Sequence, residues 1–345
     1  MTLPDEKPDL DGGGASAGAG DGAGASGAGA GFGPNAEEVS PHVQRLLRIA
    51  TTLSVLVATV LIASKGVAWF MTGAVSVLSA LIDSIMDVAA SLVNLFAVRR
   101  ALRPADVQHR FGHGKAEPLA ALVQAAFVAG SSLYLVVEVV GRIVEPRAVT
   151  HELVGVAVMV ISIVLTLGLV AFQTYVVRRT SSVAISADSL HYKGDILIHA
   201  GVIVSLFLST RFGIVVADPL IGICIAIYLF WNVWRIVQSS LGSLMDRELS
   251  QEDRARIIEI ALAHPEVCDI HDLRTRQAGP RAFIQFHLEL PKDISLMHAH
   301  EISDEVEAKV RAAFPGGGVI IHQDPEGIME HRATFVGEGK EAKEF

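Results

Sequence analysis

Residues 80–94 read ALIDSIMDVAASLVN, and residues 187–204 read ADSLHYKGDILIHAGVIV. Both stretches are apolar enough to cross a lipid bilayer, yet each holds a pair of ionisable residues at i,i+4 spacing: Asp83 and Asp87, then His191 and Asp195. A charge at bilayer depth costs several kcal/mol, and such residues are usually functional. This spacing puts both members of a pair on one helix face, and three carboxylates with one imidazole form a complete ligand set for Zn²⁺. The sequence therefore predicts a path for a metal ion through a membrane.

The apolar residues of the chain, which has 345 residues and is 51% hydrophobic, fall into six long runs. They cover residues 46–70, 75–98, 117–141, 152–177, 187–210 and 214–237. Runs of about 20 apolar residues are typical of membrane helices, whereas buried helices of a soluble protein would be shorter and amphipathic. We therefore expect a polytopic α-helical membrane protein with six transmembrane helices over residues 41–240, surrounded by lipid bilayer.

Basic residues favour the loops on one side of these spans. They are Arg45, Arg48, Arg99, Arg100, Arg103, Arg110, Lys115, Arg178 and Arg179 on that side, against Arg142, Arg147 and Arg211 on the other. Short loops rich in Lys and Arg stay in the cytoplasm. We therefore expect both termini to be cytoplasmic.

The regions outside the spans differ sharply from them in composition. Residues 1–40 are Gly/Ala-rich, with too little apolar bulk to offset the cost of ordering, and we expect a disordered cytoplasmic tail. Its start, MTLPDEKPDLDGGG, lacks the apolar core of a signal peptide. Residues 246–325 show helix and strand patterns in the order αββαβ, which suits a cytoplasmic α+β domain with helices on one side of a sheet. We expect residues 326–345 to form a flexible tail.

Two further groups of metal-ligand residues lie outside the spans. The loop PADVQHRFGHGKAE contains Asp106, His109 and His113, which form either a three-ligand site or a solvated loop with incidental histidines. In the predicted soluble domain, His322 and Asp324 alternate on one strand face, and His287 projects from the polar face of another strand. His271 and His300 fall in neighbouring elements. This second group could bind two ions through a bridging carboxylate, or consist of exposed histidines without metal.

Other polar residues flank the intramembrane pairs. By helical periodicity, Asn94 falls near the face of the first pair and could support its ligands. Asp188 precedes the second pair by three residues and either lines the cytoplasmic entrance or caps the helix. His199 follows that pair by four residues and either hydrogen-bonds Asp195, binds metal weakly or makes an unrelated polar contact. For Lys65, near the outer end of the first span, we expect the long side chain to reach the lipid headgroups.

The two pairs can meet only if the second and fifth spans pack together. Two separate interhelical polar contacts, or a proton relay without metal, are the alternatives. An intramembrane metalloprotease would also place metal ligands in spans, but no HExxH motif occurs in the sequence.

These motifs resemble the cation diffusion facilitator family, of the bacterial zinc and ferrous-iron efflux type. The resemblance covers residues 42–325 and is carried by LIDSIMDVAASLVN, RFGHGKAEPLAAL, VVRRT, HYKGD, HDLRTRQAGP and IIHQDP. It implies a homodimer of six-helix protomers, each with a ferredoxin-like cytoplasmic domain. The sequence departs from the family pattern in its Gly/Ala-rich N-terminus and at His199, where Asn is expected.

The resemblance also implies roles for particular residues. The two intramembrane pairs match the family's transport site, and the three loop residues match its loop site. Positions around a binuclear site at the cytoplasmic dimer interface are matched by His271, His287, His300, His322, Gln323 and Asp324. Lys115 and Asp246 match a charge pair where the membrane and soluble parts meet.

We therefore expect a secondary transporter and not an enzyme. It would export divalent cations from the cytoplasm as a metal/proton antiporter by alternating access, in the inner membrane of the cell. Zn²⁺ is the first candidate, both as cargo and as a structural or regulatory ion, and Fe²⁺, Cd²⁺, Mn²⁺ and Co²⁺ accept the same oxygen and nitrogen ligands. The coupling ion would be H⁺, and the net charge of −9 gives no indication of nucleic-acid binding. A proton-independent divalent cation channel is the alternative.

Overall fold

The computed structural model describes residues 39–72, 75–144, 153–214 and 216–328. The two predicted tails fall almost entirely outside these residues.

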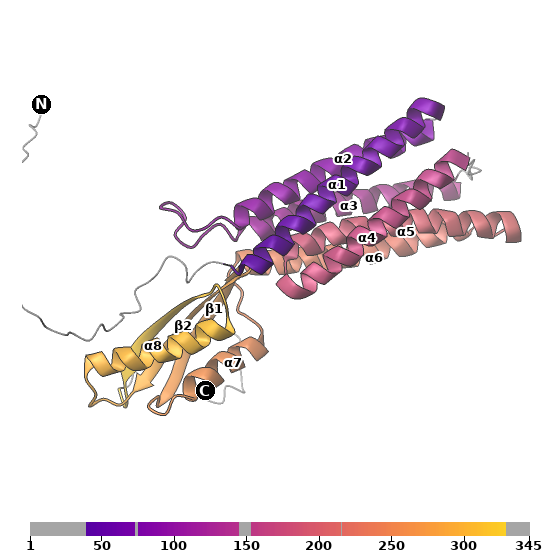
Figure 1. The fold of residues 1–345 in the computed structure, drawn as a ribbon. Helices are drawn as coiled ribbons and strands as arrows, with labels where there is room; N and C mark the ends of the chain where they lie inside the picture. The colour runs from indigo at the N-terminus through magenta and orange to yellow at the C-terminus, as the bar shows by residue number, and fades with distance from the viewer. Residues whose placement is uncertain (1–38, 73–74, 145–152, 215, 329–345) are drawn as a thin grey trace, which may run out of the picture. The chain divides into compact units, whose positions relative to one another are not determined.

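Six long apolar helices form the first part of the described chain (Figure 1). They are α1 (Pro41–Thr72), α2 (Val75–Ala101), α3 (Ala116–Val144), α4 (Leu153–Thr180), α5 (Val183–Phe212) and α6 (Ala217–Leu244). All six are long and apolar enough to span a membrane, which confirms the number of spans predicted from the sequence. Each helix is longer than its predicted span, because the apolar pattern ends before the polar last turns do.

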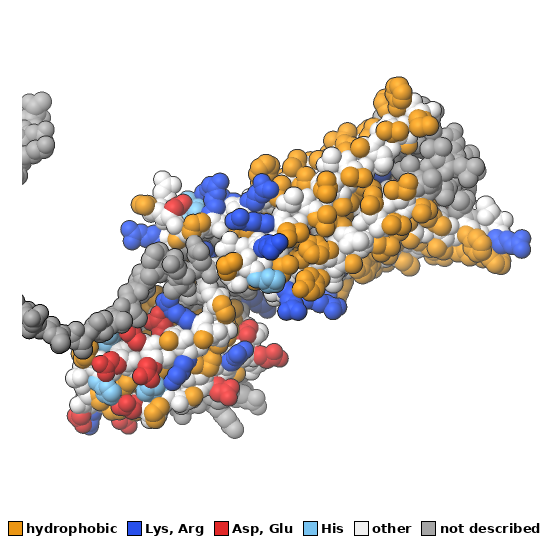
Figure 2. Space-filling model, viewed as in Figure 1, with side chains coloured by type: hydrophobic (Ala, Val, Ile, Leu, Met, Phe, Trp, Pro, Cys, Tyr) orange, Lys and Arg blue, Asp and Glu red, His pale blue; other side chains and the backbone are white. Residues whose placement is uncertain are grey.

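The helices pack pairwise around small and apolar side chains. Helix α1 packs against α2 and α4, α3 packs against α6, and α5 contacts every other helix of the bundle. Large apolar side chains such as Phe70 and Trp231 remain exposed on the outside of the bundle, as expected of a surface that faces lipid. The face of the bundle in Figure 2 is predominantly hydrophobic, with Lys and Arg gathered mostly at one end.

The second part is a small α+β domain. Its elements are α7 (Gln251–Leu262), β1 (Asp269–Ala278), β2 (Arg281–Leu290), α8 (Leu296–Ala313) and β3 (Gly318–Pro325), in the predicted order αββαβ. The sheet order is β1-β2-β3, with β2 antiparallel to β1 and parallel to β3.

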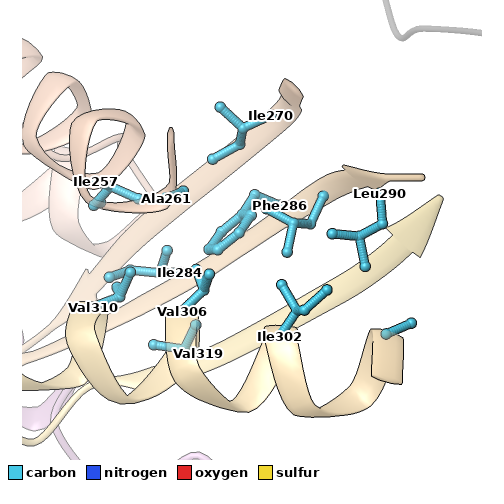
Figure 3. Packing of buried hydrophobic residues seen from close by; sticks show 12 residues of the cluster. Ile257, Ala261, Ile270, Ile284, Phe286, Leu290, Ile302, Val306, Val310 and Val319 are labelled. Carbon is cyan, nitrogen blue, oxygen red and sulfur yellow. The ribbon is translucent and has the colours of Figure 1, made fainter. Parts of the chain in front are cut away.

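The strands alternate between a buried face and a polar face. Ile284 and Phe286 on β2 are buried against Ile302 and Val306 on α8, as Figure 3 shows. Because side chains alternate along a strand, the residues between them point to the opposite face. His287 therefore lies on the sheet face away from α8.

Candidate metal centres

Helices α2 and α5 pack together and bring three of the four predicted intramembrane ligands into one group. His191 Nε2 lies 2.9 Å from Asp87 Oδ1 and 3.9 Å from Asp195 Oδ2. Each of the three residues offers a ligand atom within 4.8 Å of the others. Ligand atoms around a tetrahedral Zn²⁺ lie about 3.3 Å apart, since its bonds to nitrogen and oxygen are about 2.0 Å long. The group is therefore close to the geometry that a small divalent cation needs.

Asp83, the fourth predicted ligand, lies outside this group. It occupies the preceding turn of α2, while His191 faces Asp87 directly. Asp83 nevertheless lines the same cavity as the other three residues, and it lies close enough to Lys65 for their charges to interact. Three of the four predicted ligands thus form a group in this structure, and Asp83 lies at the edge of that group.

A cavity of about 830 Å³ surrounds the group within the helix bundle. Its polar lining includes Glu138 on α3, His199 on α5 and Asp218 on α6. His199 is partly buried, and its Nδ1 has no hydrogen-bond partner among the described residues. The predicted hydrogen bond from His199 to Asp195 is therefore not formed through that atom.

Lys65 lines this cavity and is turned into the helix bundle. Its side chain is buried, with 6% of the residue exposed, and Nζ donates a hydrogen bond of 2.6 Å to Ser84 Oγ on α2. The expectation of a headgroup contact was wrong. Sequence position alone placed Lys65 near the end of a span but could not show that it hydrogen-bonds α2 within the cavity.

Asp188 is fully buried one turn before His191 on α5. Its carboxylate accepts hydrogen bonds from Ser54 Oγ on α1 at 2.7 Å, Gln173 Nε2 on α4 at 2.7 Å and Gln124 Nε2 on α3 at 3.2 Å. It neither lines the cavity nor caps α5, whose N-cap is Ser182. Both predicted roles of Asp188 are therefore replaced by a structural one, joining α5 to three neighbouring helices.

Two more polar residues lie behind the ligand group. Asn94 is fully buried beside Asp188, although its amide does not meet hydrogen-bond geometry with it. Tyr192, also fully buried, forms a 2.8 Å hydrogen bond with Ser91 Oγ and donates one to Ser54 O at 3.2 Å.

The glutamines and serines that hold α5 in place were not predicted from the sequence. Polar residues such as Gln124 and Gln173 within apolar spans were the available signal.

The predicted loop group is assembled between α2 and α3. Asp106 Oδ1 lies 3.2 Å from His109 Nδ1, and Asp106 Oδ2 lies 3.3 Å from His113 Nε2. Backbone hydrogen bonds, first from His109 N and also from Gln108 N, lower the pKa of Asp106 and so favour its carboxylate form. His113 is buried while the other two residues are exposed, so the group is open to solvent on one side.

Three residues of the soluble domain form the third group: His271, His287 and Asp324. His287 pairs with His271 on β1 and with His322 on β3, so the three histidines form a row across the sheet. Asp324 Oδ2 lies 2.7 Å from His287 Nδ1 and 3.4 Å from His271 Nε2. Its other oxygen lies 3.2 Å from His322 Nε2, so this buried carboxylate contacts all three rings.

Two residues predicted for this site lie elsewhere. Gln323 alternates with its strand neighbours and faces α8, where Nε2 donates to Ser303 Oγ at 2.9 Å. His300 is exposed on α8, 3.6 Å from Asp304. Asp272 also lies near the site, with Oδ2 3.9 Å from His287 Nε2, and its carboxylate accepts a hydrogen bond from Arg274 Nη2 at 2.9 Å. Asp272 was missed because a bulge in β1, where its φ is +48°, redirects its side chain.

Lys115 and Asp246 form the predicted charge pair, with Nζ 3.0 Å from Oδ1. Lys115 Nζ also donates to Leu244 O at 3.3 Å, and Arg276 lies 3.4 Å from the same carboxylate oxygen. Partial burial acts to raise the pKa of Asp246, but the hydrogen bonds and charges of Lys115 and Arg276 outweigh it and lower that pKa.

Comparison with known proteins gives a consistent result for both parts of the chain. Residues 51–245 match the cation efflux transmembrane domain, and residues 249–326 match the cytoplasmic domain of cation efflux proteins. The cation-efflux pump FieF of Cronobacter sakazakii is 46% identical over 285 residues, covering 83% of this chain and 95% of that pump. FieF of Klebsiella pneumoniae subsp. pneumoniae is 46% identical with the same coverage. A solved structure of CzrB in its zinc form is 38% identical and covers 25% of this chain and 99% of its own, with a TM-score of 0.24.

The apolar helices and the ligand group enclosed between them define a multi-pass membrane protein of the cation-transporting class. The chain belongs to the cation diffusion facilitator, or cation efflux, family, as the sequence motifs indicated. It is a cation efflux transporter of that family.

Proposed function

We propose that the chain exports divalent metal cations from the cytoplasm in exchange for protons, with Zn²⁺ as its principal cargo. The observation that carries the proposal is the group formed by Asp87, His191 and Asp195, three ligand atoms within 4.8 Å of one another inside the helix bundle. Asp83, which lines the same cavity, completes the proposed transport site.

The ligand set supports Zn²⁺ without excluding related ions. One imidazole nitrogen and several carboxylate oxygens suit Zn²⁺, whose d¹⁰ shell imposes no geometry of its own. Fe²⁺, Mn²⁺, Co²⁺ and Cd²⁺ accept the same ligand types, and the group contains no thiolate to select a softer ion. The relatives carry the name cation-efflux pump, which agrees with a broad cargo class.

The geometry of His191 supports proton coupling. The same atom, Nε2, faces both Asp87 and Asp195, at 2.9 Å and 3.9 Å. When Nε2 is protonated, it donates a hydrogen bond to a carboxylate. A metal ion would instead be coordinated by the lone pair of the deprotonated Nε2. Metal and proton therefore exclude each other at Nε2, so that binding one expels the other.

The energy balance requires such a coupling ion. Moving one elementary charge against a membrane potential of about 100 mV costs about 2.3 kcal/mol, and a dication costs about twice that. Protons that enter as the metal leaves supply this energy. Alternating access would expose the site to protons on one side of the membrane and to cytoplasmic metal on the other.

The remaining groups fit supporting roles in a homodimer in the inner membrane with cytoplasmic termini. We assign metal binding to the loop group of Asp106, His109 and His113 and to the soluble-domain group around Asp324. An ion held by the soluble domain would strengthen the contact between protomers when cytoplasmic metal is abundant.

The test is uptake of Zn²⁺ into liposomes that contain the purified protein, under an imposed pH gradient. Asp195→Ala is expected to abolish uptake, because it removes a ligand and leaves His191 with one carboxylate. Glu138→Gln is the matched control: it removes a carboxylate from the same cavity but not from the ligand group, and should retain most of the uptake. Unchanged uptake by Asp195→Ala would refute the assignment. Uptake that ignores the pH gradient would favour the proton-independent channel.

A further inference from the structure

Lys65 is a buried cation whose place in the cavity the metal ligands do not explain. It projects from α1, which carries none of the proposed ligands, and is 6% exposed. A buried ammonium is costly unless it is paired or hydrogen-bonded. Its hydrogen bond to Ser84 Oγ places Nζ beside the α2 turn that runs from Asp83 to Asp87.

Lys65 shares its cavity with several acidic residues. The cavity is lined by five carboxylates: Asp83, Asp87, Glu138, Asp195 and Asp218. Lys65 is the only Lys or Arg among the described residues of this lining. Its charge interacts with those of Asp83 and Asp195, one from each of the two ligand-bearing helices.

We propose that Lys65 is a tethered cation that competes with the transported metal ion for the carboxylates of Asp83 and Asp195 and thereby sets the affinity and release rate of the transport site. This inference rests on the proposed function. Lys65 does not bind the metal; it is a residue that determines how strongly the ligands hold it.

Charge balance determines how Lys65 affects metal binding. When no metal is bound, the ammonium offsets part of the carboxylate charge and stabilises the metal-free protein. When a dication binds, the ammonium repels it, and burial of Lys65 reduces the screening of that repulsion by water. Lys65 therefore lowers metal affinity relative to the same ligands without it. A transporter benefits, because a site that binds too tightly cannot release its cargo.

A purely structural role for Lys65 predicts the opposite result. If Lys65 only joined α1 to α2 through Ser84, removing it would loosen α2 and weaken metal binding. Neutralising the charge and removing the hydrogen bond therefore give distinguishable outcomes.

The experiment measures Zn²⁺ binding to full-length protein in detergent by isothermal titration calorimetry, together with uptake of Zn²⁺ into liposomes. Lys65→Met removes the charge at similar length, and Lys65→Gln also removes it but can still donate to Ser84. Ser84→Ala is the matched control, because it removes the hydrogen bond and keeps the charge. Asp195→Ala serves as the reference without a transport site.

We expect both neutral variants to lower the dissociation constant of the transport site by about tenfold or more, and to slow turnover at saturating Zn²⁺. Lys65→Arg and Ser84→Ala should stay within a few-fold of the wild type. Unchanged or weaker Zn²⁺ binding in whichever neutral variant folds would overturn the proposed role of Lys65. In that case, loss of the transport-site signal in Asp195→Ala would still support the proposed function. If Asp195→Ala binds and transports as the wild type does, the proposed function itself fails.

Discussion

Replacement of Asp188 by alanine removes the acceptor on which three helices converge. Ser54, Gln124 and Gln173 come from α1, α3 and α4, and all three donate to this fully buried carboxylate. The change removes the acceptor that these donors share beside the helix that carries His191. It therefore tests whether this network, and not apolar packing alone, holds α5 in place.

The loss in free energy of unfolding depends on how well the three donors hydrogen-bond to other acceptors. Each donor has another acceptor within reach: Ala50 O for the single hydroxyl proton of Ser54, Ala90 O for Gln124 Nε2, and Ser54 Oγ for Gln173 Nε2. Leaving a buried donor without its partner costs about 1–3 kcal/mol of folding free energy, and the alternative acceptors favour the lower end of that range. Three donors at about 1 kcal/mol each give a loss of about 3 kcal/mol for Asp188→Ala. Asp188→Asn keeps the shape and one acceptor oxygen, and should lose about 1–2 kcal/mol.

The assay is denaturant unfolding of the purified protein in detergent, monitored by intrinsic fluorescence. The monodispersity of each variant is checked separately. The expected order of stability is wild type, then Asp188→Asn, then Asp188→Ala. Surface substitutions typically stay within about 0.5 kcal/mol of the wild type. If Asp188→Ala falls within that range, the network does not hold α5, and the reasoning is refuted.

Two further predictions concern the parts outside the membrane. Because the folded-state pKa of Asp246 is lowered, its pair with Lys115 contributes stability above the unfolded-state pKa of about 3.9 and loses it as the pH falls through the folded-state value. Both partners are partly exposed, so Asp246→Asn should cost at most about 1 kcal/mol at pH 7 and nothing below the folded-state pKa; a difference that persists at the lower pH would contradict this. His287→Ala should lower the Zn²⁺ stoichiometry of the full-length protein while uptake persists, since His287 lies in the soluble domain, and an unchanged stoichiometry would contradict that site.

The sequence was sufficient for those features that depend on long or local patterns. Six apolar runs of membrane length predicted six helices, and alternation along β2 predicted that His287 points away from the buried face. The spacing of Asp83 and Asp87 correctly placed both on one side of α2, since both line the same cavity.

Features that depend on which helices meet could not be predicted. The sequence does not show that α1 closes one wall of the cavity, so Lys65 was assigned to the headgroups instead of the site. Asp188 was expected at an entrance or a helix end. Its buried position could not be foreseen, because its three hydrogen-bond partners come from helices that are distant in sequence. Gln323 was misplaced and Asp272 was missed for local reasons. Strand alternation turns Gln323 towards α8, and a bulge turns Asp272 towards His287.

The most direct test of the central claim is Zn²⁺ uptake into liposomes with a fluorescent pH indicator in the lumen. Metal–proton exchange predicts that an acidic lumen accelerates Zn²⁺ uptake and that protons leave the lumen as Zn²⁺ enters. Both signals should vanish in Asp195→Ala. Zn²⁺ uptake at the same rate with and without the pH gradient, and without any change in luminal pH, would contradict metal–proton exchange at the group formed by Asp87, His191 and Asp195.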